Sequence, residues 1–193
     1  MAYKTKSKSK KLLPTIVAVI FALIGILGLI GLALPAFIQK ATVTFLGITG
    51  EATYTVSPFS SFIFGAESIT VSGVVKVGES VTNSDPTVVN STVESCTGLI
   101  IAVVLIIVGF LATLLRKVNR FISLFGGLCF IVGGVLFFFS AQLAGVNPDD
   151  YAGEVNNSLV NAKTAVSLAA GPLLAGVLPV VGGLGAIGSS FIK

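Results

Sequence analysis

Four long stretches of the 193-residue chain carry no charged residue. They cover residues 12–39, 97–115, 121–143 and 164–192. Each approaches or exceeds the roughly 20 residues that a helix needs to cross the hydrocarbon core of a bilayer. The first three are rich in Leu, Ile, Val and Phe. The pattern therefore predicts four transmembrane helices.

The fourth stretch differs because glycine and proline interrupt it, among them Gly171, Pro172 and Pro179. Its centre, residues 168–181, is still apolar. Such residues are tolerated in a membrane where neighbouring helices satisfy the freed backbone groups. We expect a kinked span that faces other helices, with a re-entrant or surface segment as the alternative.

The first stretch follows a basic flank, as a cleaved signal peptide would. Its apolar run is about twice the usual length of a signal core, and Pro35 precedes the final residue of the small-residue motif at Ala36. An uncleaved anchor is the favoured interpretation.

Residues 40–96 follow a different period. Between Ile69 and Val77, apolar residues alternate with Thr70, Ser72 and Lys76, which is typical of a half-buried strand. Shorter strands are expected at residues 42–46, 53–56 and 88–93, with turn signals at 57–58, at 78 and at 83–86. This predicts a small antiparallel sheet of at least three strands. The residues expected to face inward are Ile69, Val71, Val75 and Val77.

Residues 144–163 form a second polar segment. Asn147, Pro148 and two aspartates resemble a helix start, and Tyr151, Val155 and Leu159 recur every four residues. We expect this segment to be partly helical and to lead into the fourth span. Asp149, Asp150 and Glu154 could hold Ca²⁺, but their spacing does not fit an EF-hand loop and helix capping explains the aspartates.

Composition agrees with a membrane location. Hydrophobic residues make up 54% of the chain and charged residues 10%, against about 25% charged residues in soluble domains. Mean hydropathy is +1.01. The predicted fold class is a membrane all-α four-helix bundle, with a small extracellular antiparallel β-sheet inserted between helices 1 and 2.

The positions of the basic residues predict the orientation. Nine of the 12 Lys and Arg residues lie in the tail at residues 1–11, in the turn at residues 116–120, or at Lys193. Basic residues mark cytoplasmic segments. Both termini are therefore expected in the cytoplasm and the polar loops outside the plasma (cytoplasmic) membrane. The basic tail would also attract anionic lipid; the +4 net charge does not indicate a nucleic-acid partner.

Candidate catalytic chemistry is sparse. The chain has no His, hence no imidazole base or His metal ligand, and its two Cys cannot close a zinc site alone. Residues 183–188 match GxGxxG, but too few residues follow for a dinucleotide-binding βαβ unit. No charged residue lies within a predicted span, which argues against a pump or coupled transporter. We expect no enzyme activity, no cofactor and no metal.

Small residues spaced four apart recur in every predicted span. Such pairs let helix backbones approach closely in lipid. They serve either packing within one bundle or a seam between two copies. The candidate helix-packing residues are Ala18, Ala22, Gly98, Ala102, Gly109, Thr113, Cys129, Gly133, Gly182, Ala186 and Ser190.

Residues 58–64, PFSSFIF, are the most apolar part of the first polar loop. They form either the core of the small sheet or a cover over helix ends, or else an exposed contact for a partner or for the outer leaflet. Phe59, Phe62 and Phe64 are the candidate contact residues in the last case.

The layout of the chain is similar to that of the claudin-type tetraspan proteins. Its elements are four spans, a long strand-rich first loop, a short basic inner turn at residues 116–120 and a shorter second loop. Small tetraspan proteins of low-GC bacteria with no assigned activity also resemble it. The chain has no Trp and its loop has only Cys96 in place of a Cys pair, so the resemblance is one of topology and assigns no functional residue.

These observations favour a non-enzymatic membrane scaffold, adhesion or accessory protein, acting through the β-rich loop and the helix-packing faces. Its expected partners are the lipid bilayer and other membrane proteins or copies of itself. The alternative is a channel or transporter component, which ion or solute flux in liposomes would distinguish.

Overall fold

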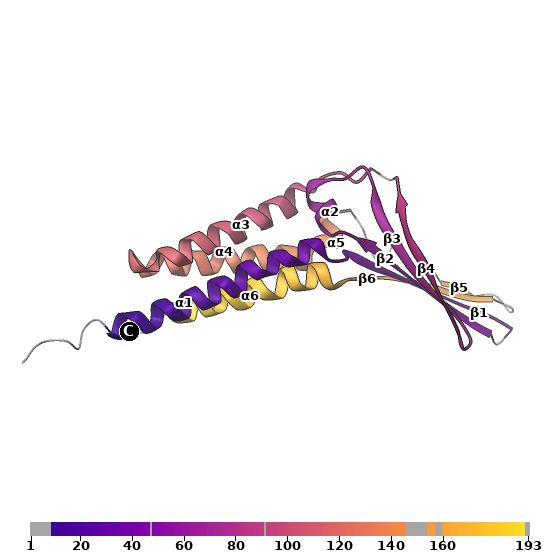
Figure 1. The fold of residues 1–193 in the computed structure, drawn as a ribbon, viewed down its shortest axis with the longest axis horizontal. Helices are drawn as coiled ribbons and strands as arrows, with labels where there is room; N and C mark the ends of the chain where they lie inside the picture. The colour runs from indigo at the N-terminus through magenta and orange to yellow at the C-terminus, as the bar shows by residue number, and fades with distance from the viewer. Residues whose placement is uncertain (1–8, 47, 91, 146–153, 157–159, 192–193) are drawn as a thin grey trace, which may run out of the picture. The chain divides into compact units, whose positions relative to one another are not determined.

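The computed structural model describes residues 9–46, 48–90, 92–145, 154–156 and 160–191. The chain divides into two compact units. The helical unit comprises Met1–Leu29, Gly98–Phe138 and Leu174–Lys193, and the sheet unit comprises Ile30–Thr97 and Phe139–Leu173. Figure 1 shows the course of the chain through both.

Four helices are long and apolar enough to cross a membrane in the part of the chain that the structure describes. The candidate spans are Leu13–Ala33, Thr97–Leu114, Arg120–Phe138 and Ala170–Phe191. They comprise α1 (Ser9–Leu27) with the 3-10 helix η1 (Gly28–Ala33), α3 (Thr97–Leu114), α4 (Arg120–Phe138) and α6 (Ala170–Phe191). Four predicted apolar helices are thereby confirmed, which indicates a membrane protein.

The helix boundaries differ from the apolar stretches in three places. The first helical segment stops at Ala33, and Phe37 already begins a strand. The third stretch divides into α4 and the short α5 (Ser140–Leu143). The fourth helix begins at Ala170 and not near residue 164. The apolar stretches are therefore longer than the helices, because the strands and the short helix next to them also contain apolar residues.

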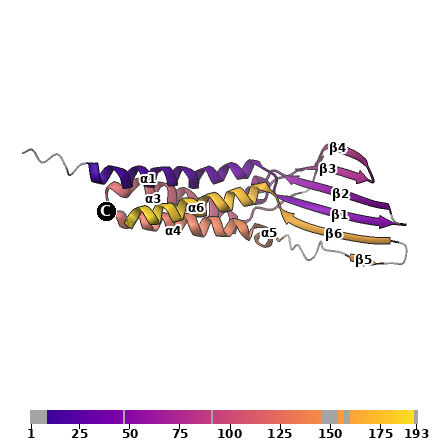
Figure 2. The ribbon, with the colours of Figure 1, turned by 90° about the horizontal axis from the view of Figure 1, so that it is seen from below.

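Among the described residues, the sheet has six strands in the order β4-β3-β2-β1-β6-β5, and every neighbouring pair is antiparallel. Figure 2 shows the strands side by side in this order. Four of them follow α1 directly: β1 (Phe37–Phe45), β2 (Ile48–Ser57), β3 (Ile69–Val77) and β4 (Ser80–Val89). The antiparallel sheet predicted between the first two helices is therefore present, and β3 coincides with the alternating segment.

The other two strands correct a prediction. β5 (Glu154–Asn156) lies in the second polar segment, and β6 (Val160–Leu168) runs from that segment into the fourth apolar stretch; a helix was expected in both places. Nine residue pairs join β6 to β1, from Phe37 opposite Leu168 to Phe45 opposite Val160. Without β6, the backbone groups on this side of β1 would lack a partner, so β6 completes the ladder. The predicted helix start at residues 147–151 lies outside the described residues.

β4 corrects a second prediction. Residues 83–86 were interpreted as a turn and residues 88–93 as a strand, whereas β4 runs from Ser80 to Val89. The register shifts opposite Val71 and Gly73, so the strand bulges at Asp85 and Pro86. Proline is tolerated at such a bulge on an edge strand. The predicted turn at Gly78 is correct, since its φ of 58° suits glycine.

A small core forms at the end of the sheet where β1 begins. The short helix α2 (Ser60–Phe64) packs there, with the rings of Phe37 and Phe62 in an edge-to-face contact at 4.9 Å. Phe59 and Ile63 are fully buried beside them. The Phe59 amide donates to the Leu34 carbonyl at 2.9 Å. α2 therefore covers one end of the sheet.

Candidate functional site

The register of the sheet separates its residues into two chemically different faces. Side chains alternate along a strand, and residues directly opposite on neighbouring strands share a face. Starting from Val43, the pairing places Gly50 and Val77 on one face, and Ala162 joins them from β6. Starting from Thr42, it places Glu51, Lys76 and Lys163 on the other.

We call the first surface the apolar face. Its members on the four central strands include Phe37, Gln39, Ala41, Val43, Phe45, Ile48, Gly50, Ala52, Tyr54, Val56, Ile69, Val71, Gly73, Val75, Val77, Ala162, Thr164, Val166 and Leu168. Apart from Gln39 and Thr164 they are apolar or aromatic. None is charged, whereas the opposite face, which we call the polar face, carries Lys40, Glu51, Lys76 and Lys163.

The apolar face is most buried beside α2 and most exposed at the far ends of its strands. In β1, Phe37 is 4% exposed, Val43 43% and Phe45 50%. In β3, Gly73 is buried but Val75 and Val77 are 37% and 51% exposed. The prediction that Val75 and Val77 face a buried interior is therefore wrong. They share a face with Ile69 and Val71, as expected, but nothing in the described part of the chain covers them.

The three phenylalanines of residues 58–64 differ in burial, so some fit the interpretation as a core and one fits the interpretation as an exposed contact. Phe59 and Phe62 belong to the core under the sheet, so they are not available to a partner. Phe64 is 56% exposed and is the only one of the three that could contact another molecule. α2 explains the split, because one side of so short a helix faces the sheet and the other faces away.

The helix-packing candidates are all buried except Gly98, which is half-buried in the first turn of α3. Three of them, Gly109, Gly133 and Gly182, lie at contacts between helices, since a β-carbon there would come within 3.0 Å of a carbonyl oxygen on a neighbouring helix. On α3, Thr113 donates its hydroxyl to the Gly109 carbonyl of the same helix at 2.8 Å, so its polar group needs no partner on another helix. Ser190 does the same with the Ala186 carbonyl on α6 at 3.1 Å.

Two glycine doublets on α4, seven residues apart, bring its backbone close to those of α3 and α6. Gly126 and Gly133 face α3, where a β-carbon would lie 2.7 Å from the Gly109 carbonyl oxygen and 2.9 Å from that of Ala102. Gly127 and Gly134 face α6, with the carbonyls of Gly183 and Gly176 at 2.8 Å and 2.6 Å. Glycine is needed on both sides of α4, since a side chain would separate the backbones.

The sequence reasoning found Gly133 but missed Gly126, Gly127 and Gly134. The sequence contains the pattern that could have identified them, namely the glycine pairs at residues 126–127 and 133–134. Pairs seven residues apart lie at nearly the same angle around a helix, since seven residues make about two turns. The two members of each doublet therefore serve two neighbouring helices.

Arg116 joins three segments at one end of the helical unit. It lies in η2 (Leu115–Lys117), and its guanidinium donates to the carbonyl of Pro14 at 2.8 Å and to the carbonyl of Ser189. The Ser189 carbonyl is in the last turn of α6, where carbonyls lack helical partners. A cation also suits the negative end of the helix dipole there. Burial lowers the pKa of Arg116, since desolvation disfavours its charge.

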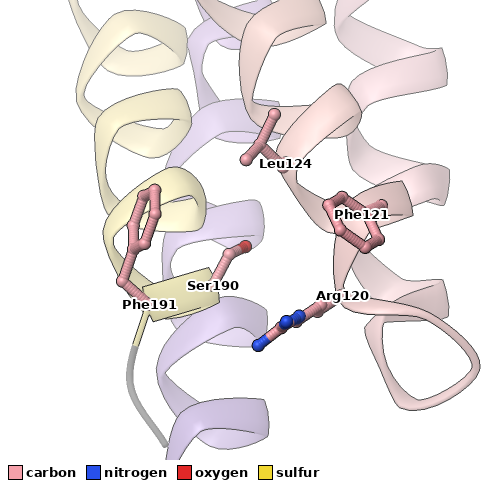
Figure 3. Close-up of a pocket in the computed structure, with 5 residues that line it drawn as sticks. All are labelled: Arg120, Phe121, Leu124, Ser190 and Phe191. Carbon is pink, nitrogen blue, oxygen red and sulfur yellow. The ribbon is translucent and has the colours of Figure 1, made fainter.

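An open pocket of about 210 Å³ lies between the start of α4 and the end of α6. Figure 3 shows its lining, formed by Arg120, Phe121, Leu124, Ser190 and Phe191. The Arg120 guanidinium stands over the Phe121 ring at 5.6 Å. Two rings and one cation suit an acyl chain with an anionic group, but the surrounding side chains of Phe121 and Phe191 are largely exposed.

Both cysteines are free thiols. Cys129 is buried on α4, and the Cys96 thiol donates to the Leu143 carbonyl at 3.1 Å. Among the described residues, no group of three or more His, Cys, Asp or Glu side chains could hold a metal ion. The described surfaces with the chemistry of a binding site are thus the apolar face and the pocket.

The fold and these surfaces define a class: a chain with four apolar, potentially membrane-crossing helices and an amphipathic antiparallel sheet. No protein-family model and no curated protein matches the chain. Function must therefore be argued from the class and its surfaces alone.

Proposed function

We propose that this chain is a non-enzymatic membrane scaffold or adhesion protein that crosses the plasma membrane four times and binds protein partners through its sheet. Both termini and η2 would lie in the cytoplasm, and the sheet outside, in the claudin-like tetraspan layout. The basic residues of the tail and of the turn at residues 116–120 support this orientation.

The observation that carries the proposal is the exposed part of the apolar face away from α2, where Val43, Phe45, Val75 and Val77 are 37–51% exposed. An exposed apolar surface of this kind marks an interaction site, since burying it against a partner is favourable by roughly 25 cal/mol per Å². The polar face is the ordinary solvent side of an antiparallel sheet. The helical unit would supply the anchor, with its outward Leu, Ile and Val side chains in lipid.

Site-specific photo-crosslinking in native membranes tests the proposal. A crosslinking side chain at Val77, on the apolar face, should yield a defined protein adduct. The same group at Val81, which is 57% exposed on the polar face, is the matched control and should yield much less. Equal adducts at both positions would contradict a role for the apolar face.

Liposomes that contain only this protein provide the second test. A scaffold should leave them as impermeable to ions and small solutes as empty vesicles. Selective flux that depends on the protein would overturn the proposal and establish the channel alternative.

A further inference from the structure

We infer that the apolar face of the sheet binds the apolar face of a second copy of this chain, so that two sheets pack face to face. The inference rests on the proposed role of the sheet as the binding element and names its partner.

The distribution of small and large side chains on the apolar face suits packing against another sheet. The middle of this face is formed by small residues, namely Ala41, Gly50 and Ala52, and larger side chains stand around them at Val43, Phe45, Ile48, Tyr54 and Val77. Two copies could place the large side chains of one over the small residues of the other. Packed sheets lie about 10 Å apart, with side chains interdigitated in this way.

The area is sufficient for a pair. Neighbouring strands are about 4.8 Å apart, and each residue adds about 3.3 Å along a strand. The exposed portion of the apolar face, which lies away from α2, therefore measures on the order of 600 Å². Two copies would then bury about 1,200 Å², at the lower end of specific protein interfaces. Because no charged residue lies on the central strands of this face, no charge loses its hydration when the copies meet.

The edges of the sheet offer a poorer contact. β4 carries the bulge at Asp85 and Pro86, and a bulge and a proline both interrupt pairing with another strand. β5, at the opposite edge, has three residues. Association through the face is therefore favoured over growth of the sheet.

A second copy fits the face better than lipid does. On β4, the residues that share this face include Ser80 and Thr82, whose hydroxyl groups would find no hydrogen-bond partner among acyl chains. In a face-to-face pair they lie at the margin, where water or the facing sheet can reach them. The polar faces of both copies, with Lys76 opposite Glu51 in each, stay in water.

Two matched substitutions test the inference on the full-length protein. Val77 and Val81 are 51% and 57% exposed, and they lie on opposite faces at the same hairpin. A glutamate at either position stays in water in a single copy, so both variants should fold with the circular dichroism of the parent. In a pair, Val77→Glu buries a charge and Val81→Glu does not.

The readout is the number of copies per particle, from light scattering in detergent and from stepwise photobleaching in vesicles at low protein density. The parent and Val81→Glu should form pairs, and Val77→Glu should weaken the pair roughly 100-fold or more, because it buries a charge without a partner. A parent protein that stays single in both settings, or a Val77→Glu variant that pairs as the parent does, would overturn the inference.

The same experiments keep this inference separate from the proposed function. A crosslink from Val77 to a different protein, with the parent single, would refute pairing but support a scaffold. Protein-dependent flux in liposomes would refute the scaffold whatever the number of copies.

Discussion

Gly109 on α3 and Gly126 on α4 meet backbone to backbone. A β-carbon at Gly109 would lie 2.8 Å from the Gly126 carbonyl oxygen, and one at Gly126 would lie 2.7 Å from that of Gly109. Real β-carbons do not come so near to a backbone atom. The contact is reciprocal, so neither helix can accept a side chain without moving the other.

We therefore predict that Gly126→Ala destabilises the helical unit by about 1–3 kcal/mol, the usual range for overpacking. Thermal unfolding in detergent measures the change. Gly188→Ala on α6 is the control, because a β-carbon there meets nothing within 4 Å. That variant should be neutral or slightly more stable, since alanine favours helix over glycine. Equal destabilisation by both would argue against the α3–α4 contact.

Arg116→Lys should also lower the stability of the helical unit. The planar guanidinium reaches two carbonyls, those of Pro14 and Ser189, while a lysine ammonium on a different stem cannot keep both contacts. Losing one charged hydrogen bond costs about 1.5–3 kcal/mol. Lysine retains the positive charge, so any effect on membrane orientation is avoided.

The control for Arg116→Lys is Arg120→Lys. Arg120 is exposed, and its guanidinium lies over the neighbouring Phe121 ring at 5.6 Å. The melting temperature of the Arg120→Lys variant should stay close to that of the parent. A melting temperature for Arg116→Lys as high as that of Arg120→Lys would show that the double contact does not stabilise the bundle.

Phe62→Ala should loosen the end of the sheet at α2. Phe62 is 8% exposed and packs on Phe37, and truncating a buried phenylalanine costs about 3–5 kcal/mol. Limited proteolysis should then cut residues 37–89 faster. Phe64→Ala removes the same group from a side chain that is 56% exposed, and it should leave the rate unchanged. The reverse order would mean that the α2 core is wrongly assigned.

Thiol labelling tests the proposed orientation. In a Cys-free background, Glu79→Cys lies in the exposed β3–β4 turn and Val118→Cys lies beside η2, at a position that is 77% exposed. An impermeant reagent should label Glu79→Cys in intact cells, and Val118→Cys only after permeabilisation. Labelling in the opposite order would invert the topology.

How much of this could be predicted differs between the two units. The apolar helices were predictable because about 20 apolar residues in succession are a local property that lipid or a bundle must accommodate. β3 was predictable for a similar reason, since its alternation lies in nine consecutive residues. The boundaries of the helices were less predictable. Phe37 and Leu168 are as apolar as helix residues, yet they pair with each other on neighbouring strands of the sheet.

Long-range pairing lies beyond what local pattern determines. Residues 160–168 form a strand because their backbone groups pair with those of β1, which lies more than 100 residues earlier in the chain. The pattern of residues within 160–168 does not identify β1 as the partner.

By itself, the sequence determined the apolar helices, their small-residue faces and the alternation of β3, since each depends on neighbours along the chain. The tertiary structure alone decided which helix each glycine of α4 meets and that Phe59 and Phe62 are buried while Phe64 is not. It also decided that Val75 and Val77 are exposed, since nothing in the described part of the chain packs over them. Alternation predicts that a strand has an apolar side, but only the packing of other elements determines whether that side is covered.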